Sequence, residues 1–289
     1  MKKLISGILV SILFLLGCQN ESVETPTKKE LIAIESQIIQ KNQVLQMVNA
    51  AQSGNYQKVD ELLKKGVDVN GSGKYELPTS RGIRGYNNAL EAACYGGHYD
   101  IAKLLVSKGA DVNFSSILGK TPLYSAVYGG NIDIVKLLLD NGAKVNLGES
   151  ALLAALKQNQ TEIAALLIDK GANVNYMKES GLSPLKEAVR IGSIEIVKKL
   201  LDNNAIINDK RAEFGNHAHT PLWVAVSMGH TNIVKLLLDE GADINIVDNA
   251  SGTTPLDIAM ELESEAIVGG RKETFKEIIA MLKDSKTSN

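Results

Sequence analysis

Residues 121–146 read TPLYSAVYGGNIDIVKLLLDNGAKVN, and this stretch decides the fold. Thr121 followed by proline is typical of a helix start, because a hydroxyl can cap the first turn and proline is tolerated there. Ile134 and Leu138 then fall one helical turn apart, which predicts a second helix with one buried face. Gly142 supplies the left-handed residue that ends such a helix. The stretch therefore predicts two short helices joined by a tight turn.

The same pattern recurs along most of the chain. Its closing asparagine falls at positions 70, 113, 146, 175, 208 and 245, mostly near 33 residues apart. The opening Thr/Ser-Pro-Leu recurs at 183–185, 220–222 and 254–256, with degenerate forms at 88–90 and 150–152. Asn204 stands where the other copies have the glycine, and asparagine is the next best residue there. Units that bury their apolar face only against their neighbours predict a stacked solenoid with polar caps at its ends.

A period near 33 residues with T-P-L-x-x-A, G-x-x-x-I-V-x-x-L-L and G-A-D-V-N resembles the ankyrin repeat, over about residues 44–284. The resemblance implies an all-α ankyrin-repeat solenoid of about six to seven repeats, each a pair of antiparallel helices, with β-turn or hairpin loops between them. It also implies a non-enzymatic protein-binding module without a cofactor or a metal. With helical caps at 30–54 and 271–284, we expect the domain to span 30–284 and a short tail to span 285–289.

The N-terminus is typical of an export signal. Two lysines precede an apolar run, Leu4–Leu16, that is shorter than the roughly 20 residues a membrane-spanning helix needs. The run ends in LLGC at Cys18, which resembles the bacterial lipobox. An ordinary secretory signal and an uncleaved anchor are the alternatives.

The lipobox resemblance implies that residues 1–17 are removed and that Cys18 carries acyl chains such as palmitate. Residues 18–29 are polar and predict a flexible tether between this lipid anchor and the repeats. In a Gram-negative host, Gln19 after the cysteine implies the outer membrane, with the domain in the periplasm. We expect a monomer.

The composition indicates which kinds of partner and which sources of stability to expect. The formal net charge is −2 and no basic stripe is present, so a nucleic-acid partner is not expected. The chain has 2 cysteines, and lipidation of Cys18 leaves Cys94 without an intrachain disulfide. Cys94 occupies a column that holds valine in sister repeats, which predicts a buried, inert thiol.

No residue set predicts catalysis. His217 and His219 lie in an inserted loop and offer two imidazoles to a metal, but no third ligand lies nearby, so a solvated loop is favoured. The stretch at 68–73 begins like a calcium loop, yet position twelve is Thr79, where a bidentate glutamate is expected. Both stretches are therefore interpreted as structural.

The family resemblance implies that partners bind the concave face and the ends of the first helices. The residues at those ends differ from repeat to repeat while the core columns stay apolar, as expected of a recognition surface. A merely tolerant surface column is the alternative. The predicted partner-binding residues there are Tyr95, Tyr128, Lys157, Arg190 and Met228.

Two further places are candidates for partner binding. The position after T-P-L holds Tyr124 and the single tryptophan, Trp223, which either contacts a partner or is partly buried between repeats. The insertion at 71–86 carries Tyr75, Arg81 and Arg84, and is either a binding loop or a disordered spacer.

The sequence therefore predicts a protein–protein interaction scaffold anchored in the bacterial envelope. The alternative is an immunity protein that binds and neutralises an antibacterial toxin in the periplasm, and a stress-protection role is a third hypothesis. Fold alone does not separate them.

Overall fold

The computed structural model describes residues 27–72, 88–116, 119–177, 181–210, 219–248, 251–265 and 270–287. The chain divides into two compact units, Met1–Asn42 and Gln43–Asn289. Within the described residues, all regular elements are helices and the connections are turns without strands.

Short helices alternate along the second unit. The first helices of the pairs are α4 (Ala89–Tyr95), α6 (Pro122–Tyr128), α8 (Ala151–Lys157), α10 (Pro184–Arg190), α12 (Pro221–Met228) and α14 (Pro255–Glu265). The second helices are α3 (Tyr56–Lys64), α5 (Tyr99–Ser107), α7 (Ile132–Asp140), α9 (Thr161–Asp169), α11 (Ile194–Asp202), α13 (Thr231–Asp239) and α15 (Gly270–Thr287). A longer helix, α2 (Lys28–Gln52), precedes them.

Side-chain caps start the first helices where the sequence predicts them. Thr121 Oγ1 accepts a hydrogen bond from the Tyr124 amide at 3.1 Å, and Thr220 Oγ1 accepts one from the Trp223 amide at 3.2 Å. In both helices the next residue is proline, whose missing N–H would have no partner in the first turn. The predicted helix starts are confirmed.

Left-handed residues end the helices. Gly142 has a φ of 84°, a conformation that costs glycine nothing because it has no Cβ. Asn159 and Asn204 take the same conformation, with φ of 56° and 64°. Asparagine tolerates this region better than other residues with a side chain. The turn at Asn204 is therefore kept without glycine, as the sequence predicts.

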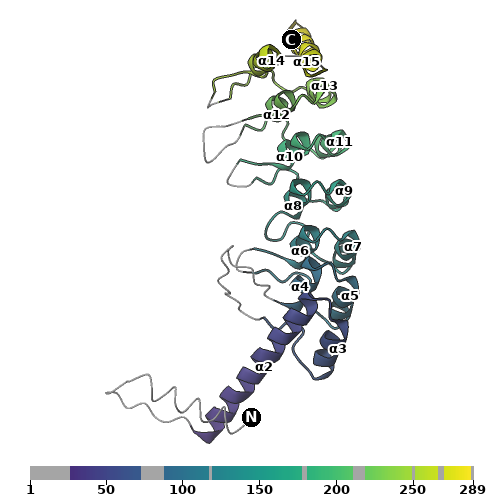
Figure 1. Ribbon diagram of the computed structural model, residues 1–289, viewed down its shortest axis with the longest axis vertical. Helices are drawn as coiled ribbons and strands as arrows, with labels where there is room; N and C mark the ends of the chain where they lie inside the picture. The colour runs from purple at the N-terminus through teal and green to yellow at the C-terminus, as the bar shows by residue number, and fades with distance from the viewer. Residues whose placement is uncertain are drawn as a thin grey trace, which may run out of the picture. The chain divides into compact units, whose positions relative to one another are not determined.

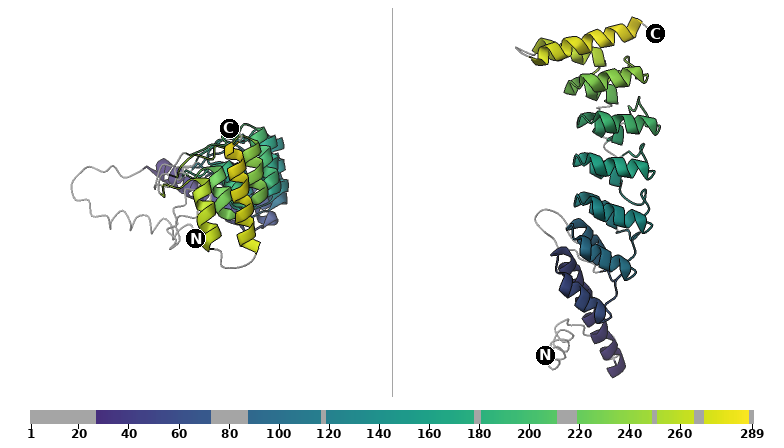
Figure 2. Two further views of the ribbon diagram at one scale, coloured as in Figure 1. Left: turned by 90° about the horizontal axis from the view of Figure 1, so that it is seen from above. Right: turned by 90° about the vertical axis from the view of Figure 1, so that its right-hand side faces the viewer.

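The pairs stack in chain order within the second unit. First helices contact the first helices of the next pair, and second helices contact second helices. Figure 1 shows these two columns, and Figure 2 shows each pair as one layer. Ile134, Val135 and Leu138 of α7 have no exposed surface, because they face the neighbouring layers. The predicted stack of paired helices is confirmed.

Asparagine side chains bridge successive turns. The side-chain Nδ2 of Asn113 donates to Gly142 O at 3.0 Å, and its Oδ1 accepts from the backbone amide of Lys144 at 2.8 Å. These bonds satisfy the backbone of the turn that follows the next second helix, and so they hold neighbouring repeats in register. The same pair of bonds is made by Asn70, Asn146 and Asn175.

The two terminal helices bury different amounts of their apolar stripes. On α15, Phe275, Ile278 and Leu282 are buried, so this helix covers the last layer. On α2, Met47 and Val48 are buried. The earlier half of the same helix exposes Leu31, Ile32, Ile34, Ile38 and Ile39. The cap predicted at residues 30–54 is therefore buried only in its second half.

Candidate functional site

The first helices present one side to the core and the other to a surface that we call the first-helix face. On α6, Leu123, Ala126 and Val127 are buried, whereas Tyr128 at the end of the same helix is 47% exposed. The equivalent ends of α4, α8 and α10 carry Tyr95, Lys157 and Arg190. The helix geometry therefore places the predicted recognition column along one face, where a partner can reach it.

Three tyrosines form a stacked group on this face, which we call the tyrosine strip. The rings of Tyr95 and Tyr128 have centroids 5.4 Å apart and planes 15° apart. The rings of Tyr124 and Tyr128 have centroids 6.3 Å apart and planes 27° apart. Tyr124 and Tyr128 are one helical turn apart on α6, and Tyr95 comes from the preceding repeat. Stacking restricts the rings before any partner arrives, so less side-chain freedom is lost on binding.

The strip is apolar in character and neutral in charge. Burial raises the pKa of Tyr124, and the nearby Glu149 carboxylate raises it further. The phenol therefore stays protonated throughout the physiological range and keeps its O–H as a donor. An aromatic surface with polar hydroxyl edges is a common feature of protein interfaces.

A close backbone contact lies beneath the strip. A Cβ on Gly129 would lie 2.6 Å from Tyr95 O and 2.8 Å from Cys94 O. Gly129 has a φ of −75°, so its role is space rather than an unusual backbone conformation. Only glycine lets α6 approach α4 this closely, and that approach brings Tyr128 onto Tyr95.

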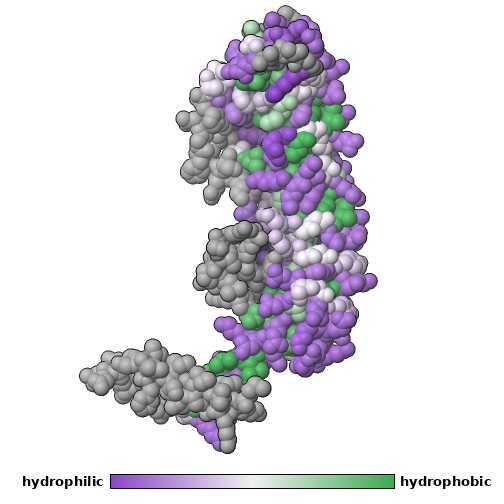
Figure 3. All heavy atoms as spheres, viewed as in Figure 1, coloured by the Kyte–Doolittle hydropathy of each residue, from purple (hydrophilic) through white to green (hydrophobic). Residues whose placement is uncertain are grey.

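Beyond the strip, the other residues predicted to bind a partner on this face are exposed, but they differ in charge and polarity. Lys157 is exposed at the end of α8, and Met228 of α12 is 52% exposed. Arg190 forms a two-bond pair with the buried Glu187, with its Nε at 2.9 Å and its Nη2 at 2.6 Å from the carboxylate oxygens. This pair raises the pKa of Arg190 and fixes the direction of the guanidinium. Figure 3 shows a largely hydrophilic surface on the face in view, with apolar residues in separate patches.

In two repeats the side chain at the position after T-P-L reaches the turn of the next repeat. Lys186 is 6% exposed, donates from Nζ to Gly181 O at 3.2 Å and lies 4.0 Å from Asp209. Trp223 is half-buried, and its Nε1 donates to Thr253 Oγ1 at 3.4 Å. The structure shows Trp223 partly buried between repeats, and its contact with a partner stays a prediction.

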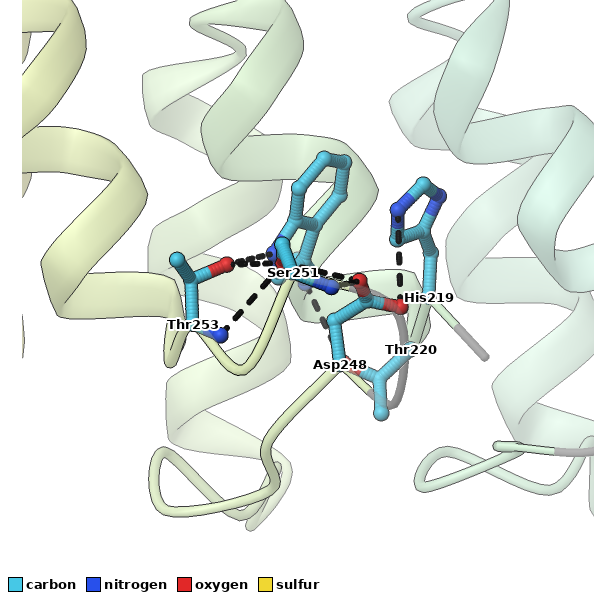
Figure 4. A network of polar contacts seen from close by, with 6 residues as sticks. His219, Thr220, Asp248, Ser251 and Thr253 are labelled. Carbon is cyan, nitrogen blue, oxygen red and sulfur yellow. Dashed lines mark hydrogen bonds and ion pairs between the residues drawn. The ribbon is translucent and has the colours of Figure 1, made fainter. Parts of the chain in front are cut away.

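His219 does not lie in a solvated loop, and that interpretation was wrong. Its ring stacks on Trp223 with centroids 3.6 Å apart and planes 3° apart, and its Nε2 lies 3.6 Å from Asp248 Oδ1. Figure 4 shows His219 pointing toward Asp248, with Ser251 and Thr253 beside it. The sequence gives no sign that Asp248 lies here, because no motif joins it to a histidine in the preceding repeat.

Several predicted residues lie outside the part of the chain that the structure describes. They are Cys18, Tyr75, Arg81, Arg84 and His217. Among the described residues, no cluster of three or more His, Cys, Asp or Glu side chains is placed to hold a metal ion. A search of the same residues finds no helix that is long and apolar enough to cross a membrane.

The prediction of a buried thiol at Cys94 is confirmed. Cys94 is fully buried on α4 and unpaired, and burial, followed by the nearby Glu91, raises its pKa. A thiol reacts through its thiolate, so this side chain acts as part of the core.

Comparisons with known proteins agree with this geometry. A family model described as ankyrin repeats (3 copies) matches residues 47–147 and 145–212, and a model described as ankyrin repeat matches 217–249. Among solved structures, the crystal structure of the human ASB11 ankyrin repeat domain is similar, with a TM-score of 0.60 and 28% sequence identity. That match covers 80% of this chain and 96% of the other. No curated protein matches this sequence.

Proposed function

This chain belongs to the ankyrin-repeat family, whose repeats mediate binding to other proteins, and we propose that it is a lipid-anchored scaffold whose partner docks on the tyrosine strip. The observation that carries the docking site is the stacked group of Tyr95, Tyr124 and Tyr128. Tyr128 is exposed and Tyr95 and Tyr124 are half-buried, and aromatic side chains on a rigid frame are frequent centres of binding energy. The partner is another protein with an apolar or aromatic segment that covers the strip.

The charges of the other candidate residues favour the tyrosine strip as the docking site over the rest of the first-helix face. Arg190 is already paired with Glu187, so a partner would have to compete for it. Lys157 is a flexible, hydrated cation, which contributes little at the centre of an interface. The tyrosines can bury area without leaving an unpaired charge, so they form the centre and the cations form the rim.

The support for the lipid anchor is the N-terminal sequence that ends in LLGC at Cys18. Two or more acyl chains give stable membrane attachment where a single chain does not. The tether predicted at residues 18–29 would hold the repeats near the membrane that carries the anchor, because a flexible stretch of about eleven residues spans roughly 20 Å. The described helix α2 begins at Lys28, so the last two residues of that stretch are helical instead. A partner would then be bound at the periplasmic side of the outer membrane in a Gram-negative host.

The docking site is tested by affinity capture from envelope extracts with residues 19–289. The double variant Tyr95→Ala/Tyr128→Ala is compared with the matched control Tyr56→Ala, which removes a tyrosine that is 41% exposed on the second helix α3. We expect the native domain and the control to retain the same protein and the double variant to lose it. Equal capture by all three, with unchanged thermal unfolding, would place binding elsewhere and overturn the site.

The captured protein also separates the two functional classes. A toxin that loses activity when bound would support the immunity hypothesis, and a resident envelope protein would support a general scaffold.

The anchor is tested separately in the full chain with Cys18→Ala. We expect the native chain to incorporate labelled palmitate and the variant not to; equal incorporation by both would contradict the lipid anchor.

A further inference from the structure

One ring contact connects α12 to the turn that precedes α14, in the next repeat. His219 directly precedes the cap Thr220 of α12, and its ring covers the indole of Trp223 at 3.6 Å. Its Nε2 faces Asp248, which comes from the turn before α14 (Figure 4). The imidazole therefore lies between an aromatic face and a carboxylate that belong to different repeats.

Asp248 organises the turn in which it lies, which we call the Asp248 turn and define as Asp248, Ser251, Gly252 and Thr253. The carboxylate is 1% exposed, and its Oδ2 accepts from both the amide and the hydroxyl of Ser251 at 2.8 Å. The Asp248 amide donates to Thr253 O at 2.9 Å, and the Gly252 amide donates back to Asp248 O at 2.9 Å. A buried carboxylate with this arrangement gains most from a cation at its other oxygen.

The charged groups on the neighbouring helices are either paired or exposed to solvent. On α10, Lys186 lies 4.0 Å from Asp209, and Arg190 is paired with Glu187. On α14, Asp257 accepts from the amide and hydroxyl of Thr254 at 2.8 and 2.7 Å. The second helix α13 carries Lys235 and Asp239, which are both exposed. Among the described residues, His219 is the titratable side chain seen next to Asp248 Oδ1, with its Nε2 at 3.6 Å.

We propose that His219 is a pH-sensitive latch that fastens the Asp248 turn to α12. Protonation gives the imidazole a positive charge that attracts the Asp248 carboxylate and the face of the Trp223 indole at once. Deprotonation removes both attractions and leaves a neutral stacked pair. Because histidine changes charge between about pH 5 and 8, the turn is held more tightly on the acidic side of this range.

The latch acts at the start of the first helix α12. Trp223 also donates to Thr253, so the indole contacts the histidine and the turn together. A partner that touches the Asp248 turn would therefore meet a more ordered surface at lower pH. This inference does not depend on where on the tyrosine strip the partner docks.

The experiment uses the intrinsic fluorescence of the mature chain, which contains 1 tryptophan. A protonated imidazole stacked on an indole quenches its emission, so Trp223 reports directly on His219. We expect emission to fall along a one-proton titration curve between about pH 8 and 5. His219→Gln should abolish the titration, and Asp248→Asn should move its midpoint to lower pH.

His230→Gln is the matched control, because His230 lies just after α12 and contacts Arg190 O at 3.4 Å instead of the indole. It should leave the titration of the Trp223 emission unchanged.

A second readout is amide hydrogen exchange at Gly252, compared between the native chain and His219→Gln at each pH so that intrinsic exchange cancels. The ratio of the two rates should widen by roughly threefold to tenfold as pH falls, which corresponds to an ion-pair contribution of up to one pKa unit.

Two results would overturn the latch. One is identical pH dependence of emission in the native chain and His219→Gln. The other is an exchange ratio at Gly252 that stays constant with pH. If Asp248→Asn does not fold, the comparison of the native chain with His219→Gln and His230→Gln still decides the question.

Discussion

Tyr95 and Tyr128 are equivalent residues of successive repeats, and their rings stack with centroids 5.4 Å apart. The repeat that builds the scaffold therefore also builds the surface, because the same position recurs on each layer. Where two such positions hold aromatic residues, the rings are brought together by the stacking of the repeats. In the next repeats the position holds Lys157 and Arg190, and the aromatic strip ends.

The Tyr95–Tyr128 stack should contribute to stability as a coupled pair. Tyr95→Ala and Tyr128→Ala should each lower the free energy of unfolding, and the double variant should lose about 1 kcal/mol less than the sum of the singles. Urea denaturation of the four proteins measures this coupling. Strict additivity would show that the rings do not interact in solution.

Gly129→Ala should destabilise the domain although alanine is the better helix former. The new Cβ would lie 2.6 Å from Tyr95 O, a backbone atom that cannot turn away, so α6 must shift from α4. We expect a loss of about 1–3 kcal/mol in the free energy of unfolding. Gln158→Ala, at the equivalent position of the next repeat, is the control and should change little. A neutral or stabilising Gly129→Ala would contradict the close approach.

Asn204→Ala should cost about 1–2 kcal/mol, because a β-carbon without a polar group is disfavoured in the left-handed region. Asn204 has a φ of 64°, whereas its neighbour Asn203 has a φ of −102°. Asn203→Ala is thus the matched control. Thermal unfolding followed by circular dichroism compares the two. Equal effects at both positions would mean that backbone conformation is not what selects asparagine at 204.

Cys94 should resist thiol reagents in the folded protein even at pH 9. Burial raises its pKa, with a smaller contribution from Glu91, so the thiolate is scarce well above the usual titration range of cysteine. The measurement is the rate of reaction with a chromogenic disulfide, using residues 19–289 with and without denaturant. The rate should rise sharply only on unfolding. Equal rates in both states would contradict a buried thiol.

Much of the scaffold was predictable from short patterns. Thr121 before proline predicted a helix start, and Asn204 in place of glycine predicted a left-handed turn. These features depend on hydrogen bonds and backbone angles within a few residues, so one copy of the pattern is enough to indicate them. Repetition of the pattern then predicted the stack.

The candidate site was predictable only in part. The column of Tyr95, Tyr128, Lys157 and Arg190 followed from alignment of the repeats, but the pairing of Arg190 with the buried Glu187 did not. The sequence also did not indicate that α2 is buried only in its second half, because Leu31 and Val48 are both apolar residues of the predicted cap. Sequence periodicity indicates which residues share a face, but not whether a neighbour covers that face.

The sequence by itself determined the helix pairs, their caps and turns, and the order in which they stack, because these follow from local geometry repeated at a fixed period. Only the tertiary structure decided which side chains meet across repeats. The stack of His219 on Trp223 beside Asp248 joins residues in a region where the period is interrupted. Contacts of this kind depend on the spatial approach of two separate turns, and no spacing along the chain encodes that distance.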